Sequence, residues 1–193
     1  MGVLRKLTAG SAAAILALAL WASPAGAQGV FAIPPQAQLD AMSAEEKVAM
    51  ERELTAGAAD WPLSEVDERV MQPEMGVWDP SRGGAFEGTD SLHWAEGRAL
   101  LANDDDAGEG IVRLEDFAVP NGPGLHVYLV VAEAPASPED VSAGFVDLGP
   151  LKANRGNYNY VFPGRVDRYR SVVIYSKPFD VIFAVAPMSR GGV

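Results

Sequence analysis

The stretch Leu125-His-Val-Tyr-Leu-Val-Val-Ala132 decides the fold of this chain. Every second residue from Leu125 onward is a branched aliphatic, and the residues between them begin with His126 and Tyr128. A side-chain period of two is typical of a β-strand that buries one face heavily and the other face partly. We therefore predict a central strand over this stretch.

Further short strands are predicted on both sides of it. Residues 172–175 and 181–186 are apolar at both odd and even positions, as in strands that are covered on both faces. Lys177-Pro178 between them predicts a tight hairpin. The other candidate strands cover 85–88, 92–95, 98–102, 111–116, 145–148 and 158–162. About nine short strands without intervening helices favour a mainly β domain over residues 81–190, either an antiparallel sandwich or a barrel-like fold.

Residues 28–80 precede this domain and predict a helical appendage or linker. Ser43-Ala-Glu-Glu46 has the pattern of a capping box, with a helix continuing to Glu53 or Leu54 and Gly57 as its stop. Ser64-Glu-Val-Asp67 has the same pattern and predicts a second helix that ends near Met71. Neither segment carries a clean apolar stripe, so the sequence leaves open whether these helices dock on the β domain.

The first 27 residues have the features of a signal peptide. Arg5 and Lys6 form a positive start, an apolar run follows, and Ala25-Gly-Ala27 is a cleavage signal. Cleavage between Ala27 and Gln28 would release a periplasmic or secreted protein, and no later segment has the pattern of a membrane span. We expect export without a retained anchor.

Composition excludes several kinds of chemistry. The 193 residues include no cysteine, which excludes disulfides, thiolate nucleophiles and thiolate metal sites within the chain. The formal net charge is -11, and the acidic residues are concentrated before residue 111, so nucleic acid is not expected as a partner. Because nucleotide-binding loops, the hydrolase serine elbow and zinc protease motifs are all absent, we consider an enzyme the less favoured alternative.

Two weaker patterns concern metals. Asp104, Asp106 and Glu109 form an acidic cluster of the kind that calcium favours, but the glycine and glutamate spacing of a calcium-binding loop is missing. We prefer a solvated hairpin loop there. The two histidines, His93 and His126, are predicted in different strands and could meet across a sheet, yet two partly buried histidines with ordinary partners are the simpler interpretation.

Two polar segments in the second half also have alternative interpretations. The segment 157–160 alternates asparagine with Tyr158 and Tyr160, side chains that can bind sugars or flat ligands but also suit a sandwich strand. Arg165, Arg168 and Arg170 form a basic cluster, for which a salt-bridged surface is favoured over an anion site. With His126 and Lys152, the two tyrosines are the candidate ligand-binding residues.

Several separated motifs resemble the DM13 domain family over about residues 84–188. They are Gly84-Ala-Phe86 with His93 and Gly97, Leu114-Glu-Asp-Phe117, Asn121-Gly-Pro123, Leu125-His-Val-Tyr-Leu129, Asp147-Leu-Gly-Pro-Leu-Lys152, Gly156-Asn-Tyr-Asn-Tyr160 and Ser171-Val-Val-Ile-Tyr-Ser-Lys-Pro-Phe179. The resemblance implies an extracytoplasmic β-sandwich module for which electron transfer has been proposed. That activity is attributed largely to a cysteine, whose position corresponds to Ser176 in this chain.

The serine at this position changes the expected chemistry. A hydroxyl forms no disulfide, has no sulfenic acid state and is no soft metal ligand at neutral pH. Gly124 likewise stands where the family often has an aspartate. We therefore expect a non-catalytic binding or interaction module whose partner is a small ligand or an extracytoplasmic protein, with no cofactor of its own.

Two alternatives stay open at this point. One is an electron-transfer component that uses a bound cofactor or a partner protein in place of a thiol. The other is a hydrolase with Ser176 as nucleophile and His93 or His126 as base, which requires an exposed serine within hydrogen-bond reach of an imidazole.

Overall fold

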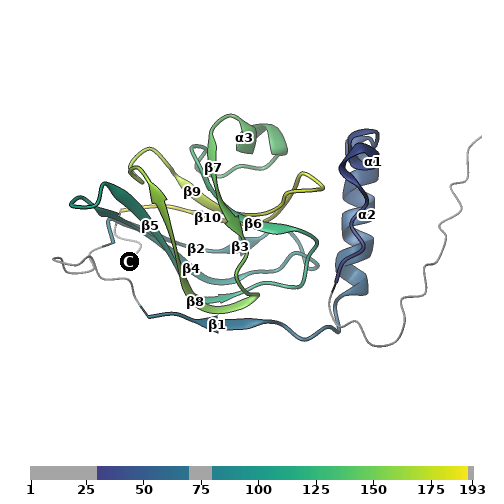
Figure 1. The fold of residues 1–193 in the computed structure, drawn as a ribbon, viewed down its shortest axis with the longest axis horizontal. Coiled ribbons are helices and arrows are strands. Elements are labelled where there is room, and N and C mark those ends of the chain that lie inside the picture. The colour runs from purple at the N-terminus through teal and green to yellow at the C-terminus, as the bar shows by residue number, and fades with distance from the viewer. Residues whose placement is uncertain (1–29, 70–79, 191–193) are drawn as a thin grey trace, which may run out of the picture.

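Two β-sheets face each other in this protein (Figure 1). The structure, a computed structural model, describes residues 30–69 and 80–190. The first sheet has the order β1-β8-β5-β4-β2, from Glu65–Asp67, Arg155–Pro163, Glu109–Ala118, Glu96–Asp104 and Arg82–Ala85. The second has the order β3-β10-β9-β6-β7, from Glu87–Gly88, Val181–Pro187, Ser171–Ser176, Leu125–Val130 and Phe145–Pro150. The predicted mainly β fold is confirmed, as a sandwich and not as a closed barrel.

The predicted central strand, β6, lies between β9 and β7 and pairs antiparallel with both. Leu125, Val127 and Leu129 belong to the main core between the sheets. Tyr128 and Val130 point to the opposite face and join a smaller cluster. The period of two therefore separates the two faces of the strand as expected.

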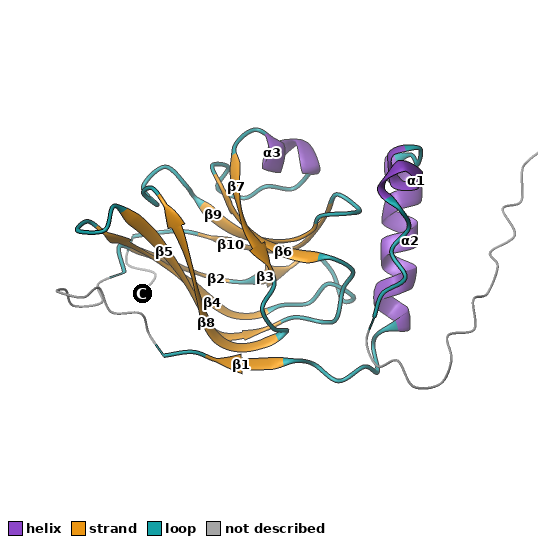
Figure 2. Ribbon diagram, viewed as in Figure 1, coloured by secondary structure: helices purple, strands orange, loops and turns teal. Residues whose placement is uncertain are grey.

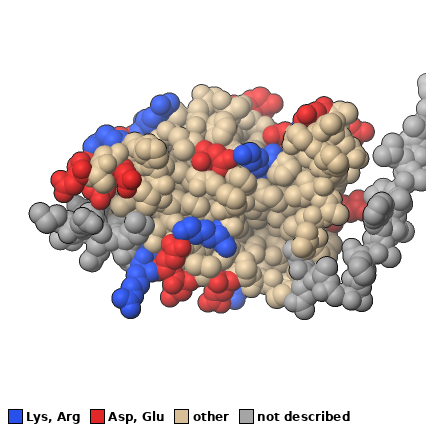
Figure 3. Space-filling view, viewed as in Figure 1, with Lys and Arg blue, Asp and Glu red and all other residues tan. Residues whose placement is uncertain are grey.

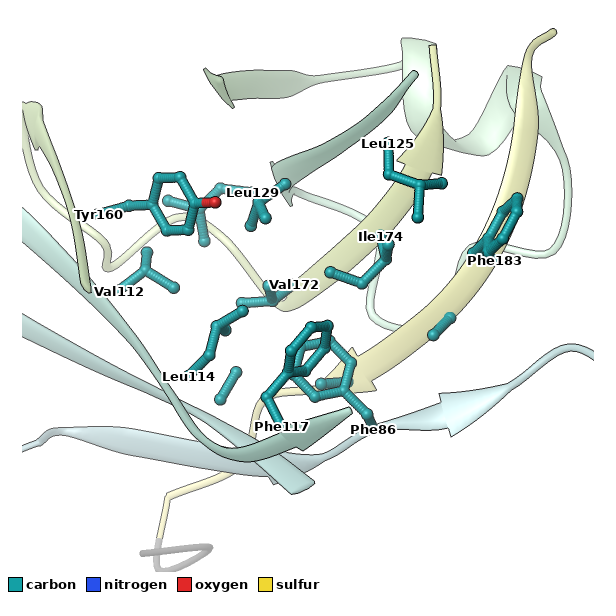
Figure 4. Packing of buried hydrophobic residues seen from close by; sticks show 14 of the residues in the cluster. Phe86, Val112, Leu114, Phe117, Leu125, Leu129, Tyr160, Val172, Ile174 and Phe183 are labelled. Atoms are coloured by element: carbon teal, nitrogen blue, oxygen red, sulfur yellow. The ribbon is translucent and has the colours of Figure 1, made fainter. Parts of the chain in front are cut away.

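The main core, which fills the space between the two sheets, is built from aliphatic and aromatic side chains of both (Figure 4). Phe117 on β5 is fully buried in it, with its ring 5.1 Å from that of Phe86 and 5.9 Å from that of Tyr158. Leu129 and Ile174 enter from the second sheet. Burial of this apolar area is the principal stabilising contribution to the fold.

Two hairpins connect neighbouring strands as the sequence indicates. Residues 177–180 form the turn between β9 and β10, and Asp180 adopts a positive φ of 56° there. Residues 105–108 form the turn between β4 and β5, and Asp104 pairs with Glu109 across its base. The acidic segment is thus the expected hairpin loop.

Three predictions about individual elements were wrong. Residues 65–67 form β1 and not a helix, because they pair in parallel with residues 155–157 of β8. Residues 92–95, including His93, form a loop and not a strand. Residues 85–88 are divided at Phe86, where the chain passes from β2 in one sheet to β3 in the other. The remainder of the second predicted helix, up to Met71, lies outside the described residues.

The pairing of β1 depends on a glycine. Gly156 has a φ of 120°, and a Cβ atom placed on it would collide with the carbonyl oxygen of Val66. Only glycine combines this conformation with such a close approach of another backbone. The edge of the first sheet therefore accepts a strand from residues 28–80, the region predicted as an appendage or linker.

The helices are short apart from one (Figure 2). α1 covers Gln36–Asp40, α2 covers Ala44–Gly57 and α3 covers Pro138–Ser142. The predicted capping box at Ser43 is present: its hydroxyl accepts from the Glu46 backbone, and the Glu46 carboxylate accepts from the Ser43 backbone. α1 and α3 were not predicted.

The helical appendage docks on the sandwich, which answers the question left open by the sequence. Leu39 of α1 is part of the main core. Glu51 of α2 is fully buried, accepts a hydrogen bond of 2.6 Å from Thr55, and lies 3.0 Å from Nε2 of the buried His93. Lys47 pairs with Asp180 at 2.7 Å at the rim of the same contact. A carboxyl group so deeply buried requires such partners.

Candidate functional site

Ser176, the position predicted from the sequence to match the family's cysteine, is sealed inside the sandwich. It ends β9, pairs with Leu125 and Val181, and has no exposed surface. Its hydroxyl donates a hydrogen bond of 2.7 Å to the carbonyl oxygen of Pro123. A nucleophile must reach both its substrate and a base, so the hypothesis of a serine hydrolase at this position is wrong.

His126 belongs to a small polar cluster beside β6 and β7. Its Nδ1 lies 2.8 Å from one carboxylate oxygen of Asp147, and Lys177 Nζ lies 2.8 Å from the other. Burial alone would raise the pKa of the Asp147 carboxyl, but the hydrogen bonds from Lys177 and His126 outweigh it and hold that pKa below its usual value. His93 contacts Glu51, so the two histidines have separate partners.

Of the other candidate ligand-binding residues, Tyr158 and Tyr160 belong to the main core and Lys152 lies beside them at the surface. The Tyr158 hydroxyl donates to the Ala153 carbonyl at 2.6 Å, and the Tyr160 hydroxyl donates to the Pro150 carbonyl at 3.0 Å (Figure 4 shows Tyr160). Lys152 Nζ lies 5.3 Å from the centre of the Tyr160 ring and pairs with Glu68 at 2.7 Å. The structure thus brings Lys152, Tyr158 and Tyr160 together and leaves His126 in a different place.

The acidic hairpin holds its side chains in ordinary contacts. Asp104 accepts a hydrogen bond of 3.1 Å from the Ala107 backbone, and Asp105 pairs with Arg165. In the part of the chain that the structure describes, no three histidine or acidic side chains are placed to hold a metal ion. Acidic and basic atoms lie beside each other in patches over the visible face (Figure 3), consistent with mutual neutralisation at the surface.

A site that sequence reasoning missed lies on the outer face of the second sheet, under α3. The rings of Phe145, Tyr128 and Tyr175 come from β7, β6 and β9 and stack in that order, with centroid distances of 4.8 and 5.0 Å. They line a cavity of about 490 Å³ together with residues of α3 and the β9–β10 turn. The volume is within the range of small-ligand sites.

A second cavity of about 550 Å³ adjoins the first. Both are lined by Pro138 and Glu139 of α3 and by Asp180 of the turn. The second cavity continues between these residues and α2, where Val48 is 42% exposed. We call the two cavities together the α3 groove. The appendage forms one wall of the larger cavity, through Lys47 and Val48 of α2.

Two sequence signals could have indicated the α3 groove. Ser137-Pro-Glu-Asp140 is a capping box with proline at the start of a helix, and the structure shows both of its hydrogen bonds. Tyr128 and Tyr175 stand on the less apolar faces of their strands. The cover over these rings depends on contacts between segments far apart in the sequence, which no local pattern contains.

In the described ranges, no helix has the length and apolar character needed to cross a membrane. These features define a two-sheet β-sandwich with a ligand-sized groove on one outer face and a buried serine beside it. The chain belongs to the DM13 family: the family model described as Electron transfer DM13 matches residues 86–188, which confirms the resemblance found in the sequence. No curated protein and no solved structure matches the chain.

Proposed function

We propose that this protein is an exported DM13 module that binds a partner in the α3 groove without thiol chemistry. The observation that carries the proposal is the contrast between two positions. Ser176 is inaccessible and already hydrogen-bonded, whereas the neighbouring Tyr175 lines an accessible cavity. The groove is thus the part of this second-sheet surface that a ligand or partner can reach.

The sequence supports an exported location. Arg5, Lys6, the apolar run and the cleavage signal before Gln28 are the features of a signal peptide. A periplasmic or secreted protein meets small ligands and extracytoplasmic proteins, and the net charge of -11 disfavours nucleic acid. The partner in this proposal is therefore a small ligand or an extracytoplasmic protein.

An electron-transfer component is the second candidate, because the matching family model carries that description. With no cysteine in the chain, such a protein would need a bound cofactor or a partner protein to carry the electron. We place this function second, because it requires a further redox group, whereas binding in the α3 groove requires only the residues that line it.

The two candidate functions predict different visible absorption for the purified protein. The exported protein is purified from the cell fraction outside the cytoplasm of its native host, and its visible absorption is measured per chain. We expect no band from haem, flavin or copper and an N-terminus at Gln28 by mass spectrometry. A stoichiometric visible cofactor would overturn the binding-only function, and an intact N-terminus in the cytoplasmic fraction would overturn the export.

A further inference from the structure

Two tyrosines in the α3 groove have hydroxyl groups that the rest of the fold leaves unused. Tyr128 and Tyr175 are only 3% and 5% exposed, and both line the smaller cavity. The hydroxyls of Tyr158, Tyr160 and Ser176 each donate a hydrogen bond within the fold, whereas those of Tyr128 and Tyr175 have no partner among the described residues. No side-chain oxygen there is both fully enclosed and unsatisfied, so these hydroxyls are reachable from the cavity.

These hydroxyls act as hydrogen-bond donors over the physiological range. Burial, followed by the charges of Asp147 and Asp180, raises the pKa of Tyr128 to about 12. Burial, then Asp180, Tyr128 and Glu139, raises the pKa of Tyr175 further. Neutral phenols donate to an acceptor oxygen on the ligand, and the two lysines in the cavity walls, Lys47 and Lys177, are already paired with Asp180 and Asp147.

The larger cavity of the groove offers apolar contacts. Its walls include Val48 of α2, Phe179 of the turn, and Val181 and Ile182 of β10. Val48 is well exposed for a large aliphatic side chain on a docked helix. An apolar side chain of a ligand would bury this surface, and each methylene so buried contributes to affinity.

One carboxylate at the junction of the two cavities is available to a cation. Asp180 pairs with Lys47, and Asp147 pairs with Lys177 and His126. Glu139 lines both cavities and has no ion-pair partner among the described residues. The net charge of -11 adds a long-range attraction for a basic partner.

We infer that the α3 groove binds an extended peptide segment of a partner protein that carries an apolar side chain next to a lysine or arginine. Its carbonyl oxygens accept hydrogen bonds from Tyr128 and Tyr175, its apolar side chain enters the cavity beside α2, and its cationic side chain pairs with Glu139. This inference rests on the proposed binding function and names the partner's chemistry.

The test measures binding of three short peptides to the full exported chain by isothermal titration calorimetry. Each peptide is acetylated and amidated, and their central residues are Leu-Lys-Leu, Leu-Glu-Leu and Ser-Lys-Ser. We expect the first to bind most tightly, because only it offers both the apolar and the cationic group. Binding of the acidic peptide as tightly as the basic one would overturn the inference.

Substitutions of residues in the α3 groove test whether the peptide binds there. Replacing both tyrosines (Tyr128→Phe with Tyr175→Phe) removes only the two hydroxyls and should weaken the Leu-Lys-Leu peptide about two- to tenfold. Glu139→Gln should weaken it by about fivefold at low salt and less at high salt. Tyr169→Phe and Glu133→Gln are the matched controls, because neither residue lines the groove. Equal effects of variant and control would reject the assignment.

The inference and the proposed function can fail separately. If none of the three peptides binds, but a native partner does and is lost with the groove variants, the peptide inference is overturned and the binding function stands. A visible cofactor in the native protein would overturn the binding function itself. Unchanged far-ultraviolet circular dichroism and thermal unfolding in each variant exclude misfolding as the cause.

Discussion

Tyr158 in the main core and Tyr175 in the cluster under α3 are both buried, but their hydroxyl groups have different surroundings. The Tyr158 hydroxyl is bonded to a backbone carbonyl at 2.6 Å inside the fold. Tyr175 lines the α3 groove, where no described residue bonds its hydroxyl. The two residues are of the same type and similarly buried. What separates the structural tyrosine from the candidate binding residue is whether its hydroxyl has a hydrogen-bond partner within the fold.

The same difference distinguishes the two hydrophobic clusters. The main core is closed between the sheets, whereas the α3 cluster, formed by Tyr128, Val130, Val141, Val173, Tyr175 and Ile182, borders the groove. A closed core uses all its surface for stability. Beside the α3 cluster the ring of Phe145 stacks on Tyr128 and stays 44% exposed, so a partner in the groove has apolar surface to cover.

The largest expected effect comes from truncating the main core. Phe117→Ala leaves a cavity next to Phe86 and Tyr158 and should reduce the free energy of unfolding by about 3–5 kcal/mol. Phe145→Ala is the control beside the α3 cluster, where the ring stacks on Tyr128 and is 44% exposed, and it should cost only about 1 kcal/mol. Urea denaturation measures both. Equal losses would mean that the two clusters are not distinct.

The next effect concerns the buried polar contact between appendage and sandwich. Glu51→Ala leaves His93 and Thr55 without their common partner in a dry site and should reduce stability by about 1–3 kcal/mol. Glu53→Ala changes an exposed glutamate on the same helix and should stay within about 0.5 kcal/mol of the parent. Should the two variants unfold at the same urea concentration, α2 would not be held by this contact.

Local patterns predicted those parts of the fold that local forces determine. The alternation in 125–130 gave the central strand, and the capping box at Ser43 gave the start of α2. The same kind of box at Ser64 predicted a helix, yet residues 65–67 pair with a strand some ninety positions later. Pairing to β8 through the close approach at Gly156 outweighs the local capping preference.

The candidate site was harder to predict for the same reason. Alternation places Tyr158 and Tyr160 on one face of their strand, but only the pairing of β8 with β5 shows that this face is the main core. Tyr128 was assigned correctly to the less apolar face of β6. Its cavity is completed by α3, by Gln36 of α1 and by Tyr175 of β9, and the period within one strand does not show which other segments lie over it.

A smaller effect compares the tyrosine hydroxyls directly. Tyr158→Phe leaves the Ala153 carbonyl without its buried donor and should cost about 1 kcal/mol of stability. Tyr175→Phe breaks no hydrogen bond among the described residues and should change stability by less than about 0.5 kcal/mol. A clear loss for Tyr175→Phe would show that its hydroxyl is part of the fold and would remove it as a ligand donor.

The last prediction concerns how stability depends on pH, and the difference between variant and parent is expected only in strong base. The fold raises the pKa of Tyr128 to about 12, while an unfolded tyrosine titrates near 10. The native state therefore keeps this proton up to a higher pH than the unfolded state does. This contribution to stability is complete below about pH 10 and is lost as the pH rises towards 12. Tyr128→Phe should therefore lose less stability than the parent between these values, measured by urea denaturation at stepped pH. Tyr169→Phe is the control outside the groove. If both variants lost the same free energy of unfolding between these pH values, the pKa of Tyr128 would not be raised by the fold.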